Sequence, residues 1–211
     1  MKKRAVIICN GTLDTKYLYS NIRSSDFLVA VDGGSNKLVK TKFVPNVIIG
    51  DMDSISKNAL KKFKDCEFIK FPKEKAEVDL ELAIRYCLEK KFKEILILGA
   101  VGSRADMTFA NMLSLSQIPT GTDAKIVHEN QDIFISPKKL ILEGVPGERI
   151  SFIPLNGDVS GLGLKGFKYE LEDYTLKFGL GVGVSNEFKK KKTSITFKDG
   201  VLLCVHFRKW F

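Results

Sequence analysis

The stretch "PNVIIGDMDSI", residues 45–55, decides the fold class. Its apolar run Val47–Ile49 is short, is rich in β-branched residues and lies between Pro-Asn and Gly-Asp, which predicts a buried strand. Two carboxylates, Asp51 and Asp53, follow this strand directly. In extended backbone, side chains two positions apart share a face, so we expect both carboxylates to point the same way. Two like charges held close raise a pKa unless a cation lies between them, so the pair predicts a bound cation.

Similar strand-like runs alternate with helix-like segments as far as about His128. A helix is predicted for Asp79–Glu89, where apolar residues recur every three or four positions. Another is predicted for Ser56–Phe63, which begins with a serine cap. Alternation of this kind predicts an α/β domain with a mostly parallel sheet covered by helices. The predicted strands are Ala5–Cys9, Phe27–Val31, Val47–Ile49, Glu67–Lys70, Ile95–Leu98 and Lys125–His128.

The rest of the chain has a different character. Glycine and proline become frequent, and short runs such as "RISFIP", "YTLKF", "SITF" and "VLLCVHF" lack helical spacing. This pattern predicts antiparallel β-structure, as a sandwich or barrel. We therefore expect two domains, an α/β domain over residues 1–129 and an all-β sandwich domain over residues 130–211.

Composition narrows the class of protein. The chain has 211 residues, 44% hydrophobic and 28% charged, as in ordinary soluble proteins. Its first apolar run is too short for a signal peptide, and no run approaches the ~18 residues of a membrane span. Four scattered cysteines predict reduced thiols, and two histidines without ligand-like spacing make a zinc site improbable. We expect a cytoplasmic protein whose net charge of +9 suits an anionic partner.

Five polar clusters follow the predicted strands. Ligands of doubly wound sheets bind outside the carboxyl ends of the strands, which is where these clusters are expected. Taken singly, most of them are also explained by an ordinary turn or helix start. The clusters are Asn10-Gly11; Asp32-Gly33-Gly34; Asp51 with Asp53; Asp79; and "GAVGSRADMTFAN", which holds Arg104, Asp106 and Asn111.

Each cluster carries a chemical expectation. The glycines after Asp32 let a ligand approach the backbone, and Asp32 itself suits a ribose hydroxyl or a metal ion. Ser35 is expected to cap a following helix, whose N-terminus favours phosphate. Arg104 suits phosphate through bidentate hydrogen bonds. Since carboxylate oxygens are the ligands that Mg²⁺ prefers, the clusters predict a magnesium–nucleotide site with Asp51, Asp53 and Asp79 as ligands.

Two nucleotide-binding motifs are excluded. The segment "GLGLKG", residues 161–166, matches G-x-G-x-x-G, but it lies in the β-rich part with no helix after it. The P-loop pattern G-x-x-x-x-G-K-[ST] does not occur in the chain, which excludes a P-loop kinase.

The order of the motifs resembles that of the thiamine pyrophosphokinase family. The matching pieces span about Val6 to Val205: "DGG" at 32–34, "PNVIIGDMDSI", "FPKEKAEVDLELA" at 71–83, "GSRAD" with "AN" within 102–111, and "GVSNEF" at 183–188. Four positions depart from the family pattern, namely Ala76, Val78, Ser103 and Met107. The three predicted metal carboxylates are retained.

The resemblance implies an enzyme that transfers the pyrophosphoryl group of ATP to the hydroxyl of thiamine, giving thiamine diphosphate and AMP, with Mg²⁺. It implies that residues 1–129 bind the nucleotide and carry catalysis, whereas residues 130–211 bind thiamine. It also implies a homodimer, with no nucleic-acid or membrane partner.

The implied site residues follow from the matching motifs. Catalysis falls to Asp51, Asp53, Asp79, Arg104 and Asp106, with lysines such as Lys73 or Lys75 adding positive charge. Asp79 or Asp106 is expected to accept the proton of the acceptor hydroxyl, and the sequence leaves open which. The nucleotide contacts are Asn10, Asp32, Gly33, Gly34, Arg104, Asp106 and Asn111, and the thiamine contacts are Ser185 and Asn186.

Two other functions are compatible with parts of the pattern. "DMD" could serve a magnesium phosphatase as a D-x-D nucleophile, or another nucleotide-processing enzyme, although Gly50 before Asp51 argues against the phosphatase. The positive net charge could serve a non-catalytic nucleic-acid-binding protein, although no helix-turn-helix, zinc-finger or aromatic RNA-binding signature is present.

Overall fold

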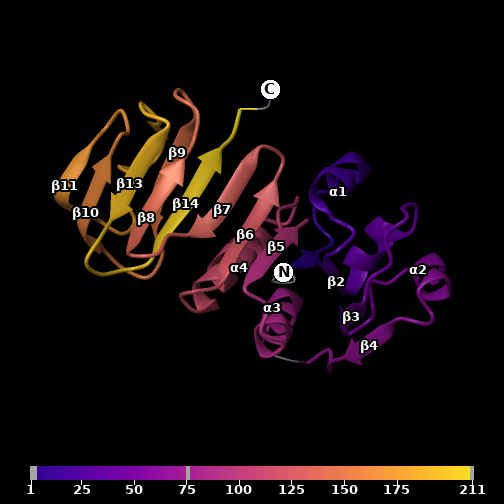
Figure 1. The fold of residues 1–211 in the computed structure, drawn as a ribbon. Coiled ribbons are helices and arrows are strands. Elements are labelled where there is room, and N and C mark those ends of the chain that lie inside the picture. The colour runs from indigo at the N-terminus through magenta and orange to yellow at the C-terminus, as the bar shows by residue number, and fades with distance from the viewer. Residues whose placement is uncertain (1–3, 75–76, 210–211) are drawn as a thin grey trace. The chain divides into compact units, whose positions relative to one another are not determined.

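The computed structural model describes residues 4–74 and 77–209, so Lys75 and Ala76 lie outside it. The chain divides into two compact units, Met1–His128 and Glu129–Phe211. In the first unit strands and helices alternate (Figure 1). Its elements are β1 (Arg4–Ile8), α1 (Thr15–Asn21), β2 (Phe27–Val31), the 3₁₀ helix η1 (Asp32–Leu38), β3 (Val47–Gly50), α2 (Lys57–Lys62), β4 (Glu67–Lys70), α3 (Asp79–Glu89), β5 (Glu94–Leu98), α4 (Ala105–Ser114), the 3₁₀ helix η2 (Leu115–Gln117) and β6 (Asp123–His128).

The six strands of the first unit form a parallel sheet. Their order is β6-β5-β1-β2-β3-β4, and every neighbouring pair is parallel. The chain therefore builds outward from β1 through β2, β3 and β4, and then adds β5 and β6 on the other side of β1. Ligands of such sheets bind at this switch point, beyond the carboxyl ends of the strands on either side of it.

Helices cover both faces of this sheet, as the strand–helix alternation predicts. One face packs against α1, η1 and α2, through buried side chains such as Leu18, Leu38 and Ala59. Helix α3 packs against β1, β2 and β3 on the opposite face and contacts α4. All five residues of β1 are buried, as expected of a central strand covered on both sides. Among the described residues, no helix is long and apolar enough to cross a membrane.

The predicted helices are confirmed, with one correction. Helix α3 has the predicted bounds, and Ser56 caps α2 by accepting a hydrogen bond from the Ala59 N–H at 3.2 Å. The helix expected after a Ser35 cap is wrong. A 3₁₀ helix starts at Asp32, directly after β2, and the Ser35 hydroxyl lies inside it, donating to the Asp32 carbonyl at 2.9 Å.

The second unit is antiparallel β-structure in two sheets. One has the order β12-β9-β14-β7 and the other the order β11-β10-β13-β8. A single apolar cluster, including Phe152, Phe167 and Phe188, contains side chains from both sheets, which makes the unit a sandwich. The strands are β7 (Gln131–Ile135), β8 (Lys139–Glu143), β9 (Arg149–Pro154), β10 (Val159–Lys165), β11 (Leu171–Leu176), β12 (Asn186–Glu187), β13 (Lys192–Thr196) and β14 (Leu202–Phe207).

A buried polar pair lies in this sandwich. His206 Nε2 is 2.8 Å from Glu148 Oε2, and both side chains are almost fully buried. Glu148 also accepts the backbone N–H groups of Val145 and Lys209, each at 2.8 Å, and the Phe188 ring stacks on the imidazole. Burial lowers the pKa of His206 although Glu148 acts in the opposite direction, so the folded unit favours the neutral imidazole.

This pair predicts an acid-sensitive stability. Because the pKa of His206 is lower in the fold than its ordinary 6.5, the unfolded chain takes up this proton first as the pH falls. We expect the free energy of unfolding to decrease below about pH 6.5, and to decrease less steeply in His206→Gln. Urea unfolding at several pH values measures both slopes. His128→Gln is the matched control, and an equal slope in wild type and His206→Gln would contradict the expectation.

Candidate active site

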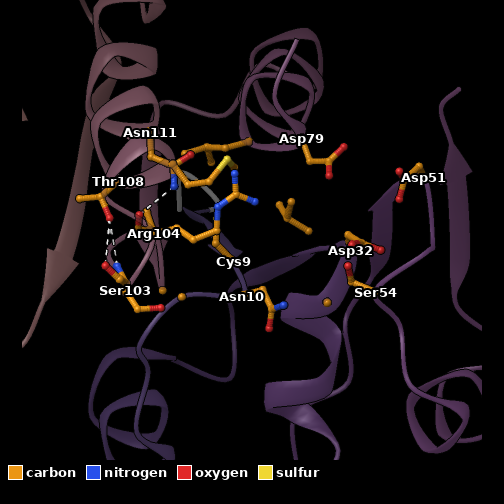
Figure 2. A pocket seen from close by; sticks show the side chains of 18 of the residues that line it. Cys9, Asn10, Asp32, Asp51, Ser54, Asp79, Ser103, Arg104, Thr108 and Asn111 are labelled. Carbon is orange, nitrogen blue, oxygen red and sulfur yellow. Dashed lines mark hydrogen bonds between the residues drawn. The ribbon is translucent and has the colours of Figure 1, made fainter. Parts of the chain in front are cut away.

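A cavity of about 370 Å³ opens at the carboxyl ends of the central strands in the first unit. The loops after β1, β2, β3 and β5 and the starts of α3 and α4 contribute its walls. Eight of the predicted site residues line it, namely Asn10, Asp32, Gly33, Asp51, Asp53, Asp79, Arg104 and Asn111. Figure 2 shows Asp32, Asp51 and Asp79 on one side of this cavity and Arg104 and Asn111 on the other. The switch point thus brings acidic and basic groups from distant segments together.

Three carboxylates form the tightest acidic group of the described residues. Asp32, Asp51 and Asp53 each offer an oxygen within 4.8 Å of the others, close enough to share one ion. Asp32 Oδ1 is buried and has no hydrogen-bond partner among the residues that the structure describes. Hard carboxylate oxygens in this arrangement suit Mg²⁺, and a buried oxygen without a partner is what an ion would satisfy. Asp79 lines the same cavity but does not belong to this group, so its role as a ligand stays a prediction.

A turn brings Asp51 and Asp53 together, and the expectation of an extended backbone between them is wrong. Met52 has φ +70°, and the Asp53 N–H donates to Asp51 Oδ1 at 3.1 Å. Gly50 is required just before the turn, because its φ is +149° and a Cβ there would lie 2.8 Å from the Asp32 Cβ. The absence of a side chain at this position lets the Asp32 carboxylate lie next to the pair.

Charges around the acidic group act in opposite directions. Burial raises the pKa of Asp32, and Asp51 adds to this effect, while hydrogen bonds from Ser54 and from the Gly33 backbone lower it. The exposed Lys73 ammonium lies 2.8 Å from Asp53 Oδ2, and this hydrogen bond holds the pKa of Asp53 below its usual range. The ammonium therefore supplies the positive charge that a divalent ion would otherwise bring.

Arg104 is the basic group across the cavity. Its guanidinium donates twice to the Asp106 carboxylate, at 2.6 and 3.2 Å, and this pairing raises the pKa of Arg104 and lowers that of Asp106. Both side chains are exposed, so the pair is weak and a phosphate can replace the carboxylate. Asp106 does not itself line the cavity.

Hydrogen bonds from two side chains of α4 hold the glycine loop that carries Arg104. Thr108 Oγ1 accepts the Gly102 N–H at 3.1 Å and donates to the Gly102 carbonyl at 3.3 Å. Asn111 Nδ2 donates to the Ala100 carbonyl at 2.7 Å, which leaves Asn111 Oδ1 buried without a hydrogen-bond partner. Thr108 was not predicted from the sequence, although its place one turn into the helix after Arg104 could have suggested it.

Gly34 and Cys9 lie near the site, and packing or burial accounts for each of them. A Cβ on Gly34 would lie 2.1 Å from the Ile8 carbonyl oxygen, so this glycine allows η1 to pack on β1, and it does not line the cavity. Cys9 lines the cavity, but burial raises its pKa to about 12. Its thiol therefore stays protonated and is a poor nucleophile or metal ligand.

The predicted thiamine residues lie in the second unit. Ser185 is exposed, with φ +62°, and its N–H donates to Ser151 Oγ at 3.1 Å. Asn186 is buried, and its side chain is engaged with the backbone: Oδ1 accepts the Tyr169 N–H at 3.1 Å, and Nδ2 donates to the Tyr169 carbonyl at 2.8 Å. Asn186 thus holds neighbouring chain segments together, and its contact with thiamine stays a prediction.

Two family models match the chain. One, described as thiamin pyrophosphokinase, catalytic domain, covers residues 18–128, and the other, described as thiamin pyrophosphokinase, vitamin B1 binding domain, covers residues 138–202. The chain belongs to the thiamin pyrophosphokinase family. Membership confirms the resemblance found in the motifs, and neither the phosphatase nor the nucleic-acid-binding alternative is favoured by it.

Individual thiamin pyrophosphokinases are similar over most of their length. Thiamine pyrophosphokinase of Bacillus subtilis is 29% identical over 182 residues, which cover 84% of this chain and 85% of that protein. Thiamin pyrophosphokinase 1 of Caenorhabditis elegans is 27% identical over 199 residues, covering 87% and 80%. The crystal structure of the Bacillus subtilis enzyme superposes with a TM-score of 0.88 at 25% identity, covering 99% of this chain and all of that one.

Substituting Asp32 tests the electrostatics of the acidic group. The raised pKa means that ionised Asp32 destabilises the fold at neutral pH, and that this effect fades as the pH falls through that pKa. We expect Asp32→Asn, in metal-free buffer at pH 7, to raise the melting temperature by about 2–4 °C, to lose this gain in acid and to bind Mn²⁺ more weakly. Calorimetry and Mn²⁺ titration measure these effects. Asp106→Asn is the control, and a pH-independent gain would contradict the assignment.

Proposed function

We propose that this chain is a thiamine pyrophosphokinase that transfers the terminal pyrophosphoryl group of ATP to the hydroxyl of thiamine. The thiamine oxygen forms a bond to the β-phosphorus, the bond from that phosphorus to the oxygen bridging to the α-phosphorus breaks, and AMP leaves. The hydroxyl proton passes to a carboxylate. The observation that carries the proposal is the cavity of a family member in which three carboxylates face an arginine.

Magnesium is the cation that we propose for the acidic group. Asp51 and Asp53 would hold it, with Asp32 as the third close carboxylate. When bound, the ion neutralises charge on the triphosphate and so favours attack at the β-phosphorus.

Two cations of the chain itself complete the positive field. Arg104, released from Asp106, would bind phosphate oxygens by paired hydrogen bonds. Lys73 is exposed at the edge of the acidic group, and an ion bound there would release it from Asp53. Its ammonium would then bind the same phosphate oxygens. Donors positioned before the reaction stabilise the charge of the transition state without reorganising during it.

Asp79 has two possible roles that an experiment separates. As a ligand its carboxylate would strengthen Mn²⁺ binding, whereas as a proton acceptor it would affect the rate and leave Mn²⁺ binding intact. Asp106 is the poorer candidate for the proton acceptor, because it does not line the cavity.

We further propose a homodimer in which the second unit of each copy supplies thiamine contacts, with Ser185 and Asn186 in that region. The support is an apolar loop beside these residues. Four of its side chains are more than half exposed: Phe178 at 58%, Leu180 at 58%, Val182 at 61% and Val184 at 51%. Exposed apolar side chains gathered in one short loop are typical of an interaction site.

An AMP-release assay tests the reaction. We expect AMP to form from ATP and Mg²⁺ only when thiamine is present, with thiamine diphosphate in equal amount, detected by chromatography. Thiamine-independent release of inorganic phosphate would instead indicate hydrolysis and reject the proposal.

The metal-site aspartates are expected to be necessary for this activity. Asp51→Asn and Asp53→Asn should each lower the rate of AMP formation by about 10²–10³-fold, because each removes a preorganised charge. Circular dichroism checks that the variants fold, and Asp65→Asn, at an exposed position between α2 and β4, is the matched control. Near-wild-type turnover in either active-site variant would remove the metal-site assignment.

The dimer is tested at the apolar loop. Val182→Asp places a charge among exposed apolar side chains, so we expect it to shift the protein from dimer to monomer at micromolar concentration in analytical ultracentrifugation. Val44→Asp changes a similarly exposed valine, 56% accessible, in the first unit and should stay dimeric. A monomeric wild type, or a dimeric Val182→Asp variant, would exclude this interface.

A further inference from the structure

The acidic group is assembled from two chain segments that the sheet does not join. Asp32 comes from η1, after β2, whereas Asp51 and Asp53 come from the loop after β3. The register between β2 and β3 ends at Val31 and Ile49, so the ladder stops before any of the three carboxylates. Three like charges this close repel one another, so a link beyond the ladder is expected to help hold the two segments at this spacing.

Asn36 supplies that link. Its Nδ2 donates to the Ser54 carbonyl at 2.9 Å, and its Oδ1 accepts the Ser56 N–H at 2.9 Å. Both ends of one side-chain amide therefore join η1 to the loop after β3, in the manner of a short strand ladder. Asn36 has no charge and does not line the cavity, and nothing in the sequence analysis singled it out.

The loop held by Asn36 is the one that carries the acidic side chains. Ser54 lines the cavity beside Asp32, and its hydroxyl donates to Asp53 Oδ1 at 3.0 Å. Ser56, the other residue bound by Asn36, caps α2. At the far end of α2, Lys62 Nζ donates to the Leu38, Val39 and Thr41 carbonyls, so α2 is fastened to η1 at both ends.

We propose that Asn36 is a positioning residue that sets the spacing of Asp32 against Asp51 and Asp53, and so sets the affinity and the size preference of the metal site. The proposal rests on the magnesium role proposed above. Substitution of a residue that orients metal ligands without binding the metal typically changes the metal affinity by about 10–100-fold. A fixed spacing also favours a small octahedral ion such as Mg²⁺ or Mn²⁺ over the larger and more adaptable Ca²⁺.

Asn36→Leu tests the proposal, because it keeps the shape of the side chain and removes both hydrogen bonds. The matched control is Asn46→Leu. Asn46 Oδ1 accepts the Leu28 N–H at 2.8 Å at the opposite end of β3, so its loss removes a side-chain hydrogen bond far from the acidic group. Binding of Mn²⁺ to the nucleotide-free full chain is followed by electron paramagnetic resonance, and binding of Ca²⁺ by competition.

We expect Asn36→Leu to weaken Mn²⁺ binding by about tenfold and Ca²⁺ binding by less, so that the ratio of the two affinities falls. The Ser56 amide should also exchange its hydrogen faster. Asn46→Leu should lower the melting temperature and leave both affinities unchanged. Asn36→Leu with unchanged affinities, or an equal loss in Asn46→Leu, would show a merely structural role and overturn the proposal.

The same titration separates this proposal from the proposed function. A wild type that binds Mn²⁺ through Asp51 but releases no AMP with thiamine would reject the transfer reaction and leave the role of Asn36 standing. If Asp51→Asn binds Mn²⁺ as tightly as the wild type does, the metal site is rejected. The proposed role of Asn36 is then rejected with it.

Discussion

The repulsion among Asp32, Asp51 and Asp53 is the constraint around which the first unit is organised. Their oxygens lie within 4.8 Å of one another, and burial makes the charge of Asp32 still more unfavourable. Several otherwise unrelated features bring the carboxylates together or offset their repulsion. The positive φ of Met52 turns the chain, Gly50 leaves room for Asp32, and an ammonium from Lys73 approaches Asp53. A site of this kind lowers the stability of the empty protein in favour of affinity for a cation.

The parallel sheet provides the rigid part of this arrangement. Because β1 is flanked by β2 and β5, loops that are far apart in sequence leave the same edge of the sheet. The acidic loops follow β2 and β3, whereas the arginine loop follows β5, so opposite charges face a common cavity. Exposed Arg104 is paired with its neighbour Asp106, and exposed Lys73 with Asp53. Such pairs are weak in water, which suits the proposed transfer of both cations to phosphate oxygens.

Local patterns in the sequence predicted the elements of the fold well, and the details of the site less well. Helix α3 and strand β2 have the predicted bounds, because apolar periodicity reports directly on burial. The sequence left open whether Asp32 joins Asp51 and Asp53 or contacts a ribose, since the grouping depends on strand order and on the turn at Met52. The spacing of residues along the chain reveals neither the strand order nor the conformation of a turn.

Asparagine illustrates why a motif residue need not touch a ligand. Asn186 lies within the family-like stretch "GVSNEF", but its amide holds the Tyr169 backbone, just as the Asn36 amide holds the loop after β3. An amide can donate and accept at once, so one side chain can hydrogen-bond to the backbone of another segment at two points. Ser185, next to Asn186, and Ser54, whose carbonyl Asn36 binds, each make a further hydrogen bond, to Ser151 and to Asp53 respectively. Asn186, inside a family-like stretch, and Asn36, outside those stretches, therefore both support backbone beside predicted site residues.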